Sequence, residues 1–325
     1  MNALVTGGAG FIGSHLVEEL VERRNDVTIL DNFSSGSMKN IIKTLHSGER
    51  ARLVSGDCKN AGDVRNAVRG AEVVFHFAAN PEVRLDLADP FTCFQENIYA
   101  THVLLEAVKL SDVKKIVFAS TSTVYGDAEV VPTPEHYSPL EPISIYGASK
   151  LASEALISSY CHSYKKKAVI LRLANIVGPR STRGVIRDFM NNLTRNQKEL
   201  DILGDGHQTK SYLHVQDCVE AVLAASQVTN ETVATYNVGS EDQVEVMEIA
   251  EIVVSEMNLK DVRYRPSGGV DGGRGWTGDV RNMQLDISRL KKLGWRPKQS
   301  SAEAIRATVR SILSDPAHTS QHQDR

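Results

Sequence analysis

A tyrosine and a lysine four residues apart, Tyr146 and Lys150, are the pair in this sequence best suited to proton transfer. On a helix this spacing puts both side chains on one face, about 6 Å apart. The lysine ammonium can there stabilise a phenolate and lower the pKa of the tyrosine from its usual value of about 10. Such a tyrosinate can remove a proton from a hydroxyl group. Because a long helix can carry Tyr and Lys at this spacing by chance, the pair gains meaning only from its surroundings.

A run of hydroxyl side chains precedes this pair, at the end of an apolar segment. It comprises Ser120, Thr121, Ser122 and Thr123, and Val-Tyr-Gly follows. Each hydroxyl can both donate and accept a hydrogen bond. The run therefore offers several partners for a polar substrate beside the predicted base.

Three glycines near the N-terminus, Gly7, Gly10 and Gly13, lie between an apolar strand and a helix-like run. Gly7 permits a tight turn, Gly10 lets the backbone approach a pyrophosphate, and Gly13 allows the helix to pack close to the sheet. The spacing is three and three, where the usual dinucleotide fingerprint has two and three. Turns alone can also demand glycine. Asp31, however, ends the next strand, where a carboxylate binds the adenosine ribose and repels the extra phosphate of NADP. These residues predict NAD as the cofactor.

Apolar and amphipathic segments alternate through the first half of the chain, as in folds built from strand–helix–strand units. Five short apolar runs are typical of buried parallel strands; they span residues 3–6, 27–30, 52–56, 73–77 and 115–120. Helix-like segments follow them at 11–23, 61–68, 92–110 and 146–164, and a sixth strand is expected at 168–173. The pattern predicts an α/β fold with a Rossmann-type doubly wound parallel sheet.

The regular alternation of strand and helix segments ends after this sixth strand. Several short elements and a glycine-rich segment at 266–278 follow, and that segment is expected to be a loop. We predict an NAD-binding Rossmann domain over residues 1–174 and a smaller C-terminal α/β cap over 175–325. The cap is expected mainly to bind substrate, with some of its segments returning to the Rossmann sheet.

Composition narrows the functional class. The chain has 325 residues with 37 basic and 40 acidic side chains, and no long run of one sign that would attract nucleic acid. None of Cys58, Cys93, Cys161 and Cys218 has metal-site or redox spacing to another, and no metal is expected. The first strand is expected to begin at Asn2, which leaves no room for a targeting segment, and no apolar run approaches the ~18 residues of a membrane span. We expect a cytoplasmic protein without nucleic-acid or membrane partners.

Several motifs occur together in a defined order: TGGAGFIGSH, DNFSSG, FHFAA, STSTVYG, YGASK and RLANIVGPR. In these motifs the sequence resembles the extended short-chain dehydrogenases/reductases of the NAD-dependent epimerase/dehydratase family, and within it the UDP-galactose 4-epimerases. The resemblance covers nearly the whole chain, from Gly7 to Pro297.

The resemblance implies that Tyr146 is the catalytic acid/base, that Lys150 is its electrostatic partner, and that Thr121 is the assisting hydroxyl. It also implies cofactor contacts from the glycine turn, the strand ends and the catalytic helix. These residues are Gly7, Gly10, Phe11, Ile12, Gly13, Asp31, Asn32, Ser35, Gly36, Asp57, Cys58, Phe77, Ala78, Ala79, Asn97, Ser120, Tyr146 and Lys150. Family members usually carry a cofactor-contacting lysine two residues after Ala79, where this chain has Pro81.

The implied substrate-binding set combines the hydroxyl run with residues of the second half. Its members are Thr121, Ser122, Thr123, Asn175, Lys210, Arg274, Asp279 and Met283. Arg274 and Asp279 correspond to an Arg-x-x-Asp motif but lie five residues apart, so the extra residues must be accommodated at 275–278. Met283 corresponds to a gatekeeper beside the sugar's carbon-2 substituent, where tyrosine excludes an N-acetyl group. Arg84 is a further candidate to face the substrate.

The function favoured by the resemblance is NAD-dependent 4-epimerisation of a UDP-sugar, UDP-glucose or UDP-galactose, through a transient 4-keto intermediate. A 4,6-dehydratase is less favoured, because its family pattern has Asp-Glu where this chain has Ser122 and Thr123. A UDP-uronate 4-epimerase or decarboxylase stays open, because the hydroxyls could bind a sugar carboxylate. Asn175 favours a neutral sugar, since uronate epimerases tend to carry threonine there.

A hypothesis from a different class is a non-catalytic, dinucleotide-sensing protein on the same fold. The presence of both Tyr146 and Lys150 argues against it. The helices expected at 92–110 and 146–164 resemble those that pair in family dimers, so a homodimer is expected by analogy.

Overall fold

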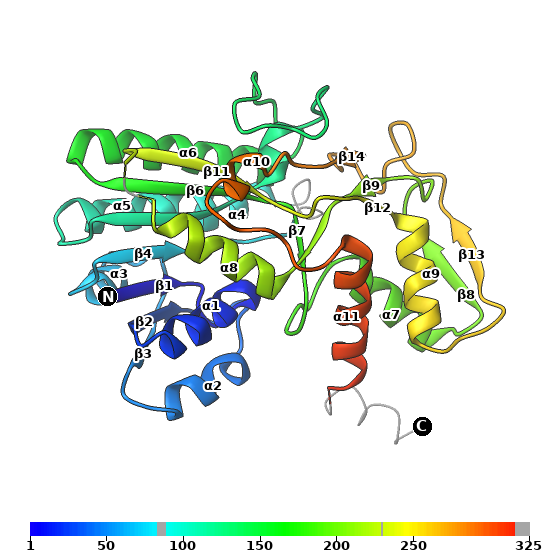
Figure 1. Ribbon diagram of the computed structural model, residues 1–325, viewed down its shortest axis with the longest axis horizontal. Helices are drawn as coiled ribbons and strands as arrows, with labels where there is room; N and C mark the ends of the chain where they lie inside the picture. Colours follow the sequence, from blue (N-terminus) through cyan, green and yellow to red (C-terminus); the bar gives the residue numbers. More distant parts are fainter. Residues whose placement is uncertain (83–88, 229, 316–325) are drawn as a thin grey trace.

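A seven-stranded parallel sheet forms the centre of the protein (Figure 1). The computed structural model describes residues 1–82, 89–228 and 230–315. Neighbouring strands pair in parallel in the order β3-β2-β1-β4-β5-β6-β11. The strands are β1 (Asn2–Thr6), β2 (Asp26–Asp31), β3 (Ala51–Ser55), β4 (Val73–His76), β5 (Lys115–Thr121), β6 (Lys167–Leu173) and β11 (Val233–Val238). The predicted doubly wound α/β fold is confirmed.

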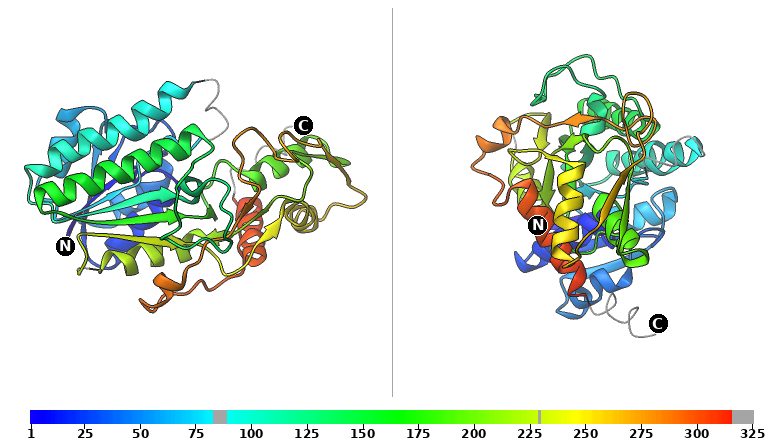
Figure 2. Two further views of the ribbon diagram at one scale, coloured as in Figure 1. Left: turned by 90° about the horizontal axis from the view of Figure 1, so that it is seen from above. Right: turned by 90° about the vertical axis from the view of Figure 1, so that its right-hand side faces the viewer.

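Helices cover both faces of this sheet (Figures 1 and 2). One face carries α1 (Phe11–Glu22), α2 (Met38–His46) and α8 (Val215–Ser226). The other carries α3 (Ala61–Val68), α5 (Ala100–Lys109) and α6 (Ile145–Tyr164). Successive strand residues face opposite layers, so Val5 packs in the first core and Leu4 in the second, both fully buried. Burial on both faces explains why the strands read as continuous apolar runs.

The segment predicted as one helix over 92–110 begins with α4 (Pro90–Cys93) and continues through a π-helical segment, η1 (Phe94–Tyr99), into α5. The carbonyl of Asn97, within η1, accepts hydrogen bonds from the hydroxyls of Thr101, at 2.6 Å, and Ser153, at 3.2 Å. These side-chain bonds satisfy a carbonyl where the regular helical ladder is interrupted. The hydrophobic pattern predicts the helix but carries no signal for this local widening.

A smaller α/β part lies at one end of the large sheet and has its own core (Figure 2). Its strands are β7 (Asn175–Val177), β8 (Glu199–Ile202), β9 (Thr209–Lys210), β10 (Tyr212–His214), β12 (Val244–Glu245), β13 (Arg263–Pro266) and β14 (Asn282–Met283). They form three small sheets, β7 with β10, β8 with β13, and β12-β9-β14. Helices α7 (Val185–Arg195), α9 (Val246–Glu256) and α11 (Ser301–Leu313) pack in this part, and the short α10 (Ser288–Lys291) lies beside β11.

The chain crosses between the two parts more than once. β6 ends at Leu173 and β7, which starts at Asn175, pairs with β10 and not with the large sheet. Later, α8 and β11 return to the large sheet, where β11 pairs with β6. The division at residue 175 stays a prediction. Arg84 lies outside the described residues. Of the helices that are described, none is long and apolar enough to cross a membrane.

Candidate active site

The glycine turn joins β1 to α1 through two close backbone contacts. Gly7 has φ +69°, and its N–H donates to the Leu30 carbonyl at 2.8 Å. A Cβ at Gly13 would lie 2.1 Å from the Gly7 carbonyl oxygen, and a Cβ at Gly7 would lie 2.7 Å from the Ala78 nitrogen. Both positions therefore exclude any other residue without a backbone shift. The turn has the tight geometry that the glycine spacing predicts.

Helix α1 presents an N-terminus suited to an anion. Gly10 precedes its first turn, and within the described residues no side chain caps that end and no acidic side chain lies in its first turn. Backbone N–H groups at a helix N-terminus, together with the helix dipole, favour negative charge. The glycine cradle and this helix end are the features that a dinucleotide pyrophosphate requires, so the residues present fit NAD.

Asp31 lies at the end of β2 and is 7 % exposed. Its Oδ2 accepts from the Ala9 N–H at 2.9 Å and its Oδ1 from the Phe33 N–H at 2.8 Å. Burial raises the pKa of Asp31, while these two backbone donors act in the opposite direction. Each carboxylate oxygen has a second lone pair with which it could accept a ribose hydroxyl.

The rest of the expected cofactor surface follows the strand ends. Asn32 donates to Asp57 at 3.0 Å, beside Cys58, whose burial raises its thiol pKa to about 12. Gly36 lies against Ala9 and Asp31, where a Cβ would contact the Asp31 carboxylate at 2.9 Å. Ser35 precedes it, Phe11 and Ile12 open α1, and Phe77, Ala78 and Ala79 follow β4. Thus the strand ends bring most of these predicted residues around one edge of the sheet.

A chain of hydrogen bonds with fixed direction connects the end of β4 to the π-helical segment. The Thr101 hydroxyl donates its proton to the Asn97 carbonyl, so it accepts from His76 Nε2 at 3.0 Å. In a neutral ring Nδ1 is then the acceptor, and the Thr6 hydroxyl donates to it at 2.8 Å while accepting from the Ala78 N–H at 3.3 Å. Burial lowers the pKa of His76 to about 3, so the ring is neutral, as this pattern requires.

Both the oxygen and the nitrogen of the Asn97 side-chain amide form hydrogen bonds. Its Oδ1 accepts from the Asn80 N–H at 2.9 Å, and its amide donates to the Ser149 hydroxyl on α6 at 2.8 Å. The π-helical segment therefore connects the Ala78–Asn80 loop with the helix that carries Tyr146.

Tyr146 and Lys150 lie in the first two turns of α6 and close to the hydroxyl run. A Cβ at Gly147 would lie 2.8 Å from the Thr123 carbonyl oxygen, so glycine lets the start of α6 approach that run. Lys150 is 2 % exposed, and its Nζ lies 4.4 Å from the Phe118 ring centroid. Burial lowers the pKa of Lys150 to about 7, which Glu154 partly counteracts.

The hydroxyl run bends directly after β5. Thr121 ends that strand and caps the short 3-10 helix η2 (Ser122–Tyr125) by accepting from the Thr123 N–H at 3.2 Å. The Thr121 and Thr123 hydroxyls lie 3.1 Å apart, and Ser122 is buried. The turn keeps the hydroxyls of Thr121 and Thr123 together at the carboxyl edge of the sheet.

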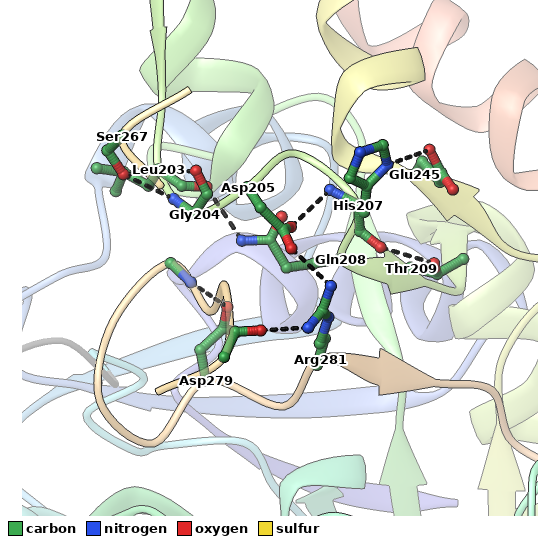
Figure 3. A network of polar contacts seen from close by, with 12 residues as sticks. Leu203, Gly204, Asp205, His207, Gln208, Thr209, Glu245, Ser267, Asp279 and Arg281 are labelled. Carbon is green, nitrogen blue, oxygen red and sulfur yellow. Dashed lines mark hydrogen bonds and ion pairs between the residues drawn. The ribbon is translucent and has the colours of Figure 1, made fainter. Parts of the chain in front are cut away.

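The predicted substrate residues of the second half form a second polar group. Lys210 forms an ion pair with Asp279, whose Oδ2 also accepts from the Gly275 N–H at 3.1 Å. Arg274 donates to the Asp279 carbonyl at 2.5 Å and to both oxygens of Asp127, at 3.0 and 2.8 Å. Figure 3 shows Asp279 at the glycine loop with Gln208 and Arg281 nearby. The loop thus absorbs the longer Arg274–Asp279 spacing while keeping the two residues in contact.

Met283 and Asn175 extend this group. Met283 pairs with Lys210 across β14 and β9 and is 8 % exposed, packed in the core. Asn175 donates to the Ser211 carbonyl through its side chain at 3.2 Å. A Cβ at Gly278 would lie 2.9 Å from the Ile143 carbonyl oxygen, just before α6. The glycine loop therefore reaches the helix that carries Tyr146.

Three features of the site were not predicted from the sequence. They are the Glu154–Arg172 ion pair, the ion pair of Arg274 with Asp127, and the hydrogen-bonded chain through His76. A signal was present for Glu154, which lies four residues after Lys150 and continues the same helix face.

Comparison with known proteins gives consistent matches over most of the chain. The family described as GDP-mannose 4,6 dehydratase matches residues 4–308. A crystal structure of a UDP-galactose 4-epimerase is 42 % identical, with a TM-score of 0.85, and the match covers 96 % of this chain and 99 % of that one.

Two further solved structures represent both reaction types. The UDP-glucose 4-epimerase of Thermotoga maritima, with UDP-glucose, is 34 % identical with a TM-score of 0.84, covering 96 % and 99 % of the two chains. A dTDP-glucose 4,6-dehydratase double mutant from Streptomyces venezuelae, with NAD bound, is 29 % identical with a TM-score of 0.88, covering 98 % of each chain. Epimerases and dehydratases are thus similarly close to this chain.

The glycine turn yields a prediction about cofactor affinity. Gly13→Ala should lower the affinity for NAD at least about tenfold, because the added methyl must displace the Gly7 carbonyl from the turn. Isothermal titration of NAD into the purified variant measures the change. Gly70→Ala is the control for an added methyl group away from the turn: a Cβ there meets no heavy atom within 4 Å, although Gly70, unlike the helical Gly13, has a positive φ of +77°. A folded Gly13→Ala protein with native affinity would contradict this account of the turn.

Proposed function

Because the chain belongs to the NAD-dependent epimerase/dehydratase family of extended short-chain dehydrogenases/reductases, we propose that it interconverts UDP-glucose and UDP-galactose by 4-epimerisation. The residue types that follow Thr121 in the hydroxyl run favour an epimerase over a dehydratase. After Thr121 the chain has Ser122 and Thr123, where the dehydratase pattern has an acid and a base. Neither hydroxyl can act as an ionised proton carrier near neutral pH, so elimination of water from the sugar has no support.

The roles of the residues follow from their chemistry. When bound, NAD supplies an acceptor for hydride from carbon 4 of the sugar and a donor for its return. Tyr146 removes the proton from the 4-hydroxyl. It returns the proton after the 4-keto sugar has rotated so that its opposite face receives the hydride. Lys150 stabilises the phenolate, and the Thr121 hydroxyl donates a hydrogen bond to the same sugar oxygen.

Binding of the nucleotide part is assigned to the second polar group. Lys210 and Arg274 supply cations for a diphosphate, and Asp279 supplies an acceptor for a ribose hydroxyl. Asn175 and Met283 lie beside this group and are assigned to the sugar. In the same proposal Asp31 selects NAD over NADP, because its carboxylate repels a ribose 2′-phosphate.

Assembly and location belong to the same proposal. Phe91 and Phe94 on α4–η1 are 61 % and 48 % exposed, and Tyr99 and Tyr164 are also exposed. Figure 2 shows the continuation of that helical stretch, α5, alongside α6 on the outside of the sheet. A homodimer that pairs these helices would cover the aromatic side chains, and we assign the protein to the cytoplasm.

The role of Tyr146 predicts a specific loss. Tyr146→Phe should lower kcat about a hundredfold or more while leaving NAD affinity nearly intact, because only the proton-transfer group is removed. Turnover of UDP-galactose by the purified variant measures this loss. Tyr160→Phe on the same helix, whose hydroxyl donates to Glu106 at 2.6 Å, is the matched control and should keep native turnover. Near-native rates for Tyr146→Phe would exclude it as the base.

Substrate choice is tested by incubating the protein with UDP-glucose, UDP-N-acetylglucosamine and UDP-glucuronate in turn and identifying the sugar of the nucleotide sugars that form. We expect efficient epimerisation of UDP-glucose and weaker action on the N-acetylated sugar, since methionine at position 283 is intermediate in size and adaptable. Met283→Tyr should lower activity on the N-acetylated sugar selectively. Efficient conversion of UDP-glucuronate with little action on UDP-glucose would favour the uronate alternative.

A further inference from the structure

A buried ion pair lies two helical turns along α6 from the proposed base. Glu154 on α6 and Arg172 on β6 are 5 % and 6 % exposed. Arg172 donates to both carboxylate oxygens, through Nη2 at 2.8 Å and Nε at 3.1 Å, and the Ser120 hydroxyl donates to Oε1 as well. Burying two charges costs much of what their attraction returns, so such a pair is weak evidence of a purely stabilising role.

The pair continues the line of the proposed catalytic residues along α6. Tyr146, Lys150 and Glu154 are spaced four residues apart and therefore follow one face of the helix. Ser120, which donates to Glu154, is the neighbour of Thr121 at the end of β5. Glu154 thus contacts the strand of the assisting hydroxyl and lies one turn from the lysine.

Lys150 needs a nearby negative charge to keep its proton. It is buried, and burial lowers its pKa to about 7 while Glu154 raises it. Among the residues that the structure describes, Glu154 is the carboxylate that acts on Lys150, whereas His76 on β4 is neutral, Phe118 on β5 offers a ring face, and Arg172 lies across Glu154 on β6. Tyr125 and Glu135, which lie near Arg172, are bonded to other partners. The Tyr125 hydroxyl donates to the Asn237 side chain, the Glu135 carbonyl accepts from Arg172, and the Glu135 carboxylate accepts from the Asn237 N–H.

We infer that Glu154, held in place by Arg172 and Ser120, is a positioning residue that keeps Lys150 as an ammonium beside the Tyr146 hydroxyl. The inference rests on the proposed role of Tyr146 as the base. Glu154 lies one helical turn from Lys150, about 6 Å, and two turns from Tyr146, about 12 Å. The Coulomb interaction falls with distance. The Glu154 carboxylate therefore affects the ionisation of the half-buried Tyr146 more by keeping Lys150 charged than by acting on Tyr146 directly.

The test is the ionisation of Tyr146 itself. Protein labelled with ¹³C at the tyrosine Cζ is titrated by NMR, and the Tyr146 signal is the one absent from Tyr146→Phe. In Glu154→Gln, which keeps the shape of the side chain but not its charge, Lys150 loses its proton at lower pH. The Tyr146 midpoint should then move to higher pH by about one unit, which is a tenfold change in the equilibrium. At neutral pH kcat should fall about tenfold, with KM within about twofold of native.

Further variants separate electrostatics from structure. Glu154→Asp keeps the charge and should restore the Tyr146 midpoint towards the native value. Glu256→Gln is the matched control: Glu256 is 12 % exposed and accepts from Arg310 at 2.7 and 2.9 Å, so its loss should lower the melting temperature without moving the Tyr146 midpoint. If Glu154→Gln fails to fold because Arg172 is left unpaired, Arg172→Gln with and without Glu154→Gln makes the same comparison.

A Tyr146 midpoint that is unchanged or lower after removal of the Glu154 carboxylate would overturn the inference. The NMR titration does not require turnover. If the protein epimerises no UDP-sugar, the proposed function fails, and the titration still decides the role of Glu154.

Discussion

The packing of one face of α6 against β5 and β6 is the constraint on which the site depends. Gly147 allows the start of the helix to approach the Thr123 carbonyl, and Lys150 lies over the Phe118 ring. Further along, the Glu154–Arg172 pair fixes the same helix to β6. This face buries the Lys150 amine and the Glu154 carboxylate next to a hydroxyl-rich strand end, and the proposed chemistry uses the resulting low-dielectric surroundings.

The parallel sheet supplies the second condition, because the carboxyl ends of its strands meet at one edge. β1 contributes the glycine turn, β2 contributes Asp31, and β5 contributes the hydroxyl run. The smaller C-terminal part then brings Lys210, Asp279 and the glycine loop towards α6. A cofactor at the strand ends and a nucleotide at the second polar group would therefore meet beside Tyr146, which is the arrangement that hydride and proton transfer at one carbon require.

Much of this arrangement could be predicted from the sequence, because its signals are local. Buried strands appear as short apolar runs, the turn appears as three glycines, and Tyr146 and Lys150 appear as a four-residue spacing. The pairs that support the site are not local: Glu154 and Arg172 are 18 residues apart, and Arg274 and Asp127 are 147 apart. Only the fold brings them together. The π-helical segment was not predicted for a related reason, since the Asn97 carbonyl within it accepts from a hydroxyl of α6 as well as from one of α5.

In the proposed reaction, hydride leaves and returns at the same carbon while Tyr146 exchanges the proton. This reaction is tested most directly with UDP-galactose carrying deuterium at carbon 4, followed by mass spectrometry and NMR of the product. We expect UDP-glucose that retains the deuterium at carbon 4, with none released to solvent. A product that has lost water and carries the deuterium at carbon 6 would contradict this reaction and identify the protein as a dehydratase.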